Sequence, residues 1–199
     1  APEADALFFS KTAAVAQSTE GYYSSTAASA YTADAVFAKL KAILATGKLR
    51  RYRARGALIM YVSSAVMNAL EQAPELTHTI ELTGVADGGV GVETRITELD
   101  GVPVMEVVDD EVFYDKFDFT GENGGFTPAS NAHKINVLVA SPLTTKLVPK
   151  ISSIYFFAPG AHPQGDGYLY QNRALSDVFT FPNGKDGEID SVFVDTDNT

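Results

Sequence analysis

Residues 134–181 read KINVLVASPLTTKLVPKISSIYFFAPGAHPQGDGYLYQNRALSDVFTF and hold the strongest strand signals in the chain. Ile135 to Ala140 form a near-continuous apolar run of strand length, which predicts a strand covered on both faces. Ile151 to Phe157 and Gly167 to Phe181 are rich in Tyr, Phe, Ile and Val and are bounded by Pro and Gly, as is typical of strands. We therefore expect three strands at the structural centre of the chain, with no catalytic motif among them.

Composition limits the class of protein. The chain has 199 residues, 45% of them hydrophobic, enough for one domain or two small ones with a real core. Its apolar runs fall short of the roughly 18 residues that a membrane-spanning helix needs, and we expect neither a spanning segment nor a secretory leader. The absence of Cys excludes disulfides and Cys-ligated metals. A net charge of −10 disfavours a nucleic-acid-binding module, which needs concentrated positive charge.

The N-terminal segment carries helix signals. Pro2 is followed by acidic residues and then by good helix formers, which predicts a helix ending near Gln17. We expect its apolar face to contain Leu7, Phe8, Lys11 and Val15. The small, polar residues 21–30 predict a connecting loop.

A second helix is predicted from the N-cap Thr32 to Gly47. The next eight residues, KLRRYRAR, hold five of the fifteen basic residues of the chain. This basic group consists of Lys48, Arg50, Arg51, Arg53 and Arg55. Two interpretations stay open, namely a contact surface for an acidic neighbour or nucleic acid, and a solvated basic loop.

Two local patterns follow. Ala57 to Val62 predict a buried strand, and Ser63 caps a short helix that ends before Pro74. Strands are also expected at residues 77–83, 92–99 and 102–108, and the last two join at Asp100-Gly101, a strong hairpin signal. The glycines of residues 86–91 precede a strand rather than a helix, which argues against a phosphate-binding loop.

An acidic cluster follows the hairpin. Its members are Asp109, Asp110, Glu111, Asp115 and Asp118, and they alternate with Val112, Phe113, Tyr114, Phe117 and Phe119. A paired-carboxylate active site or an oxygen-ligand metal site fits these residue types. The favoured interpretation is a loop whose aromatic side chains fix it to the core. Residues 121–132 predict a long polar loop, the segment most prone to disorder.

The histidines and glycines of the chain form no recognisable catalytic, metal-binding or nucleotide-binding motif. His78, His133 and His162 are far apart, and none lies in a metal-binding spacing. The chain contains neither a Gly-x-Ser-x-Gly elbow nor a Gly-x-Gly-x-x-Gly segment after a strand.

Motifs over nearly the whole chain resemble, in order and spacing, the tailed-phage major capsid proteins of the Hong Kong 97 type. PEADALFFSKTA at 2–13 resembles the end of the family's spine helix, and TADAVFAKLKAIL at 32–44 the helix that opens its axial domain. ALIMYVSSAVMNALEQAPEL at 57–76 resembles its strand, polar cap and short helix. The most specific match is the Asp-Gly hairpin in ITELDGVPVMEVVDD at 96–110. INVLVASPLTTKLVPK at 135–150 and DVFTFPNGKDG at 177–187 resemble the return to the peripheral-domain sheet.

The resemblance implies an α+β chain with the Hong Kong 97-like phage capsid fold and mixed or antiparallel sheets. Residues 1–30 would end the spine helix and belong to the peripheral domain, 31–150 would form the axial domain, and 151–199 would supply peripheral-domain strands. The family's N-terminal arm, extended loop and most of its spine helix would precede this sequence. Without them we expect a monomer or small ring, and we carry over no crosslinking chemistry.

The implied function is structural, that of a major capsid subunit that self-assembles into the icosahedral head of a tailed phage or prophage. Its partners would be copies of itself in pentamers and hexamers and other head proteins, with no membrane and only nonspecific contact to packaged DNA. Its place would be the virion, and the bacterial cytoplasm during assembly. No catalytic residue, cofactor or metal is expected, and the basic group would contact neighbouring subunits. Two alternatives stay open: a small hydrolase or carbohydrate-active enzyme using the acids of 109–118, and a head-tail adaptor.

Overall fold

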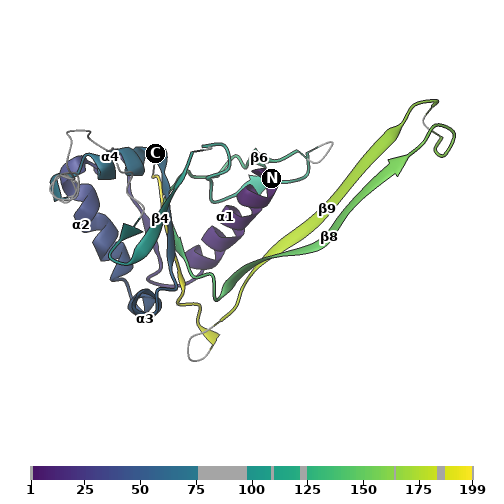
Figure 1. The fold of residues 1–199 in the computed structure, drawn as a ribbon. Coiled ribbons are helices and arrows are strands. Elements are labelled where there is room, and N and C mark those ends of the chain that lie inside the picture. The colour runs from purple at the N-terminus through teal and green to yellow at the C-terminus, as the bar shows by residue number, and fades with distance from the viewer. Residues whose placement is uncertain are drawn as a thin grey trace, which may run out of the picture.

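The computed structural model describes residues 2–75, 98–108, 110–121, 125–163, 165–182 and 187–198. A body built on a six-stranded sheet carries helices on both faces, and a long two-stranded ribbon projects from it (Figure 1). The helices are α1 (Pro2–Gln17), α2 (Ala33–Leu44), α3 (Leu49–Ala54) and α4 (Ser64–Glu71), with a 3-10 turn at Ala28–Ala30. The sheet contains β1 (Tyr23–Ser25), β2 (Ile59–Ser63), β3 (Glu98–Leu99), β4 (Val102–Val107), β7 (Ile135–Ala140) and β10 (Val192–Thr196).

The sheet is mixed, with the strand order β1-β10-β7-β2-β4-β3. β7 lies near its centre, antiparallel to both β10 and β2, and all six of its residues are buried. The expectation of a strand covered on both faces is therefore confirmed for Ile135–Ala140. The buried strand expected at 57–62 is β2, which pairs directly with β7, since Met60 lies opposite Val139 and Val62 opposite Val137.

One face of the sheet packs against α2, α3 and α4. The side chains of this core alternate along each strand, so Met60 and Val62 contribute from β2, and Val137 and Val139 from β7. Leu40, Leu44, Leu49, Val66 and Leu70 meet them from the three helices. The predicted second helix and the short helix after Ser63 are both confirmed by these elements.

The opposite face packs against α1 and the segment that contains Val112 and Phe113. The residues of α1 that enter this core are Ala6, Phe9, Ala13 and Ala16. The expected apolar face was wrong, because Lys11 is exposed and Leu7, Phe8 and Val15 are only half-buried. α1 lies against β10 and the ribbon strand β9 (Leu169–Thr180), where alanine side chains permit close approach.

Three segments expected to be loops contain short strands or a helix. Residues 23–25 of the expected loop 21–30 form β1, which pairs in parallel with β10. The basic residues 49–54 form α3 instead of a loop. Within residues 121–132, β6 (Thr127–Pro128) pairs with β5 (Phe117–Asp118).

The hairpin at Asp100-Gly101 is confirmed. Leu99 pairs with Val102 and Glu98 with Pro103, and both turn residues have positive φ, 51° for Asp100 and 78° for Gly101. Two positive φ values characterise the type I′ turn, for which Asp-Gly is a preferred pair. The strand expected at 77–83, the glycine turn at 86–91, residues 92–97 of the next strand and His78 lie outside the described residues.

The ribbon corrects the expectation of three central strands. β8 (Thr145–Phe157) and β9 pair with each other along their full lengths and with no strand of the sheet. They are mostly exposed and extend away from the body (Figure 1). β8 begins six residues before the expected run 151–157, whereas β9 lies within the expected run 167–181.

The six-stranded sheet contains strands from all three of the expected domain segments, 1–30, 31–150 and 151–199. β1 comes from residues 1–30 and β10 from residues 151–199, yet both strands lie in one sheet with β2, β4 and β7. No helix in the described part of the chain is long and apolar enough to cross a membrane.

Candidate functional site

Two members of the basic group, Lys48 and Arg51, form ion pairs with residues just before β10. α3 places Arg51 and Tyr52 beside Asp190, whose side chain is buried. The Arg51 guanidinium donates to Asp190 Oδ2 at 2.5 Å, and the Tyr52 hydroxyl donates to Oδ1 at 2.7 Å. A buried carboxylate needs such donors, because desolvation penalises its charge. Arg51 is therefore engaged within its own chain.

Two more members of the basic group form ion pairs inside the chain. Lys48 Nζ lies 2.8 Å from Glu188 Oε2, and this hydrogen bond raises the pKa of Lys48 from its usual value. Arg53 lies 3.6 Å from Asp100 at the hairpin turn, which Lys41 of α2 also approaches, at 3.5 Å. Arg50 and Arg55 are exposed. The group thus divides into three residues that fasten α3 to other segments and two that face outward.

A second buried carboxylate, Asp195, stands near the other end of β10. Its Oδ1 accepts hydrogen bonds from Ser24 Oγ and from Thr26 Oγ1 at 2.8 Å. Its Oδ2 accepts from the Tyr31 hydroxyl at 2.7 Å and from Asn136 Nδ2 at 3.0 Å. Burial, together with the adjacent carboxylate, raises the pKa of Tyr31 above its usual value near 10. Because these donors come from residues 24–31 and from β7, Asp195 connects β1 and β7 to β10.

The acidic cluster does not converge on one site. Asp115 is buried, and its carboxylate accepts from Gln17 Nε2 at 2.8 Å and from the His133 backbone N at 2.7 Å. Asp118 accepts from the Thr120 hydroxyl and backbone N, which lowers the pKa of Asp118. Phe113 takes the predicted anchoring role, together with Val112, since both belong to the core under α1, whereas Phe119 is exposed. Asp109 lies outside the described residues.

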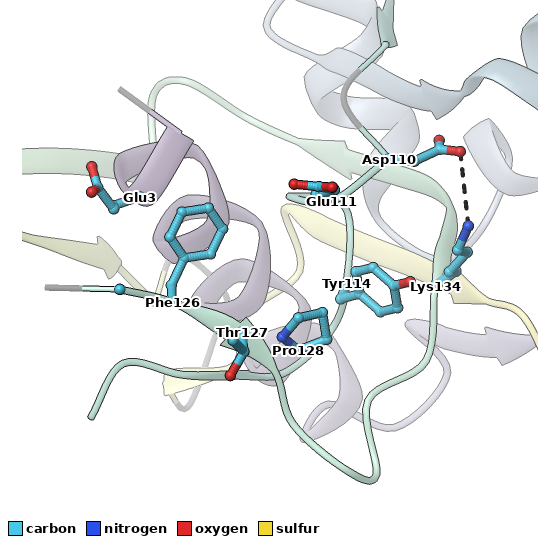
Figure 2. A pocket seen from close by; sticks show the side chains of 9 residues that line it. Glu3, Asp110, Glu111, Tyr114, Phe126, Thr127, Pro128 and Lys134 are labelled. Atoms are coloured by element: carbon cyan, nitrogen blue, oxygen red, sulfur yellow. Dashed lines mark ion pairs between the residues drawn. The ribbon is translucent and has the colours of Figure 1, made fainter. Parts of the chain in front are cut away.

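The acids that remain line an open hollow of about 530 Å³ beside the N-terminus of α1. Its lining combines Asp110, Glu111 and Glu3 with an aromatic and proline surface formed by Tyr114, Phe126 and Pro128. Asp110 lies 3.8 Å from Lys134, while Glu3 and Glu111 project from separate elements (Figure 2). The other polar side chains of the lining are those of Thr127 and Lys134, and the lysine is paired with Asp110.

Metal and histidine chemistry gain no support from the described residues. Within them, no group of three or more His, Cys, Asp and Glu side chains is placed to hold a metal ion. His162 Nε2 bonds the Gly167 carbonyl near the tip of the ribbon, while His133 donates its backbone N–H to Asp115.

The surface that sequence reasoning missed is the ribbon. Ile154, Tyr155 and Phe156 of β8 are exposed, as are Tyr168 and Tyr170 on the returning side. The rings of Phe156 and Tyr168 stack at 5.3 Å. Residue types alone could not identify these side chains as exposed, because apolar and aromatic residues also fill the two buried cores. The signal available was the length of the run 167–181, which exceeds the roughly 3–10 residues of a usual strand.

No family model matches the chain, and no curated protein matches it. Solved structures of phage capsids are similar to it. A chain of the bacteriophage PhiM1 mature capsid matches all of it with a TM-score of 0.59 and 15% identity. A chain of the capsid of the cyanophage P-SCSP1u matches 98% of it with a TM-score of 0.56 and 11% identity.

The chain has a phage capsid-like fold. It spans 61% of the length of each of these two capsid chains. The likeness includes the ribbon as well as the body, because it extends over the whole described chain. The expectation of a capsid-type α+β fold is therefore confirmed at this level.

Proposed function

We propose that this chain is the shell-forming part of a major capsid protein of the Hong Kong 97 type. The observation that carries the proposal is the likeness to a mature phage capsid subunit along all of the chain. The buried carboxylates support a structural role, since Asp195, Asp190 and Asp115 accept hydrogen bonds that connect separate segments of the fold. The protein would act as a structural subunit rather than as an enzyme, within the virion, after assembly in the bacterial cytoplasm.

The domain assignment belongs to the same proposal. We assign α1 and the β8–β9 ribbon to the peripheral domain, because α1 lies along β9. The six-stranded sheet with α2, α3 and α4 would form the axial domain. This places β10 in the axial domain rather than with the other residues of 151–199, because β10 pairs with β1 and β7.

The basic group would serve two purposes in this proposal. Arg50 and Arg55 are exposed and free to face acids of a neighbouring subunit, in pentamers or hexamers. Lys48, Arg51 and Arg53 would act indirectly, by fixing α3 through their own ion pairs. An exposed pair contributes roughly 0–1 kcal/mol, but a ring of subunits repeats the contribution.

The test is assembly of the intact protein. Expressed in bacteria, it should sediment as closed particles that electron microscopy resolves as icosahedral shells. Replacing the exposed Arg50 and Arg55 by Glu should make the particles dissociate at a lower salt concentration, whereas replacing both by Lys, which keeps the charge, should not. Folded protein that forms no particle, alone or with other phage head proteins, would contradict the proposal.

A further inference from the structure

A second, smaller hollow adjoins the acidic one and shares two of its residues. Asp110 and Lys134 line both hollows, and the second, of about 220 Å³, is also lined by Asn136 and Asp197. Together the two linings contain four carboxylate side chains and one lysine, which gives a formal net charge of −3. A surface of this sign favours a cationic occupant and repels an anionic one.

Asn136 indicates what kind of cation the second hollow suits. This residue is 2% exposed. Its Nδ2 donates to the Thr26 carbonyl at 2.8 Å and to Asp195 Oδ2 at 3.0 Å, which fixes the amide, whereas its Oδ1 accepts no hydrogen bond from a described residue. A buried amide oxygen without a donor favours a ligand that brings N–H groups of its own.

The two carboxylates of the second hollow are positioned by their own chain. Asp197 Oδ1 accepts from the Ala28 backbone N at 3.2 Å, and Asp110 lies 3.8 Å from Lys134. The ammonium of Lys134 lies 5.9 Å from the centre of the Tyr114 ring, so the adjoining aromatic surface already accommodates one cation. A guanidinium suits this site better than an ammonium, because its planar set of N–H groups can bond the amide oxygen and a carboxylate together.

The helix α3 carries guanidinium groups that are not engaged within the chain. Arg51 and Arg53 form ion pairs, whereas Arg50 and Arg55 are exposed and form none with a described residue. Charge and chemistry therefore match these two arginines to the second hollow.

The arginines and the hollow of one chain are too far apart to meet. α3 is bonded to Asp190 before β10, and Asp197 follows β10. Extended chain rises roughly 3.3 Å per residue, so these two aspartates are about 20 Å apart. In Figure 1, α3 lies at the lower edge of the body, and α4, whose residue Ala65 borders the hollow, lies at the upper edge. The contact must therefore join two copies.

We propose that the second hollow is a socket for an exposed arginine of α3, Arg50 or Arg55, from another copy of the chain. The inference rests on the proposed function and names the acids that the basic group of a neighbouring subunit meets. Because donor and acceptor lie on different surfaces of each copy, the contact is heterologous and runs from copy to copy around a ring.

Exchange of the charges tests the pairing in the intact protein. Asp110→Arg alone, and Arg50→Glu with Arg55→Glu, should each lower the particle fraction in sedimentation by about tenfold or more. All three changes together should restore most of it. Exposed Glu71→Arg on α4, combined with the same two arginine changes, is the matched control and should restore nothing. Circular dichroism confirms folding of each variant, and a triple variant that assembles no better than the arginine variant would overturn the socket.

A crosslink measures the contact without depending on closed particles. The chain contains no Cys, so Arg50→Cys and Asp110→Cys in one chain place one thiol on each surface. A short bis-maleimide should then join successive copies into a ladder of covalent oligomers on a denaturing gel, whereas either single-Cys variant should remain monomeric. Arg50→Cys with Glu71→Cys is the matched control and should give no ladder.

The outcomes separate the socket from the shell. A ladder from a protein that forms no closed particle would contradict the shell and leave the socket standing. Particles that give no ladder would overturn the socket and leave the shell standing. A product that stops at the dimer would indicate an isologous contact and would overturn the socket as well.

Discussion

Asp190 and Asp195 hold the two ends of β10 by different chemistry. Asp190 pairs with a guanidinium and a phenol, whereas the described partners of Asp195 are neutral hydroxyl and amide donors. Neutral donors around a buried carboxylate must be numerous, because none of them compensates its charge. The position of β10 therefore depends on side chains contributed by segments that precede it by more than 50 residues.

Arg51→Ala should destabilise the fold more than Arg50→Ala. Loss of the Arg51 guanidinium leaves buried Asp190 with the Tyr52 hydroxyl, and we expect the free energy of unfolding to fall by about 1–3 kcal/mol. Arg50 is exposed, so its replacement should change stability by about 0.5 kcal/mol or less. Urea denaturation of both variants measures the difference, and equal midpoints would show that the Arg51 ion pair contributes nothing.

Tyr31 makes stability depend on alkaline pH. Its pKa in the folded chain is raised, so the folded state binds this proton more tightly than the unfolded state does. The stabilisation is present below pH 10 and is lost as pH rises above it, by at most about 1.4 kcal/mol per pH unit. Burial raises the pKa of Tyr61 too, so two tyrosines contribute to the slope.

Tyr31→Phe should reduce this alkaline slope. It removes one titrating group and one donor to Asp195, so we also expect a loss of about 1 kcal/mol at neutral pH. Urea denaturation at several pH values between about 9 and 12 measures both effects. A variant whose stability falls with pH as steeply as that of the parent would contradict the assignment.

At the scale of elements, the cap of α4 offers a matched test. Ser63 Oγ accepts from the Val66 backbone N, so Ser63→Ala should cost about 0.5–1 kcal/mol. Thr32 occupies the same position before α2 but makes no side-chain cap bond, and Thr32→Ala should cost a few tenths. Thermal unfolding compares the two, and an equal loss would indicate that the Ser63 bond has no net effect.

Elements with local signals were predictable. The hairpin at Asp100-Gly101 follows from two residues that tolerate positive φ, and α4 from a Ser cap before an apolar helix pattern. The six-residue apolar run of β7 sufficed to predict a strand buried on both faces. Each of these depends on neighbours in sequence, which is why a single sequence reveals it.

Elements whose structure depends on residues distant in the sequence were not predictable. The buried face of α1 is rich in alanine where β9 and β10 lie against it, and periodicity favoured the larger Leu7 and Phe8 instead. The partner of Arg51 lies 139 residues away in the sequence, so the sequence alone did not show that this arginine forms an ion pair within the chain. The ribbon strands and β7 are both rich in strand-forming apolar residues, and only the surrounding fold determines which of these strands is exposed and which is buried.

For the whole molecule, hydrogen exchange should separate body from ribbon. Amides of β7 lie at the centre of the sheet between two packed faces and should exchange most slowly. Amides of residues 151–157 should exchange much faster, because no other segment in the described part of the chain covers that half of the ribbon. Mass spectrometry after brief labelling resolves the two, and equal protection would mean that the ribbon is covered within one chain.

The position of β10 also sets an order of events during synthesis. β10 lies between β1 and β7, so residue 194 must reach its place beside residue 23 before the sheet is continuous. Until residues 192–196 have left the ribosome, β1 lacks its partner and the core under α1 lacks Val192 and Val194. Such sequence-distant closure slows folding. A nascent chain would therefore stay incompletely folded until nearly all of this sequence had been translated.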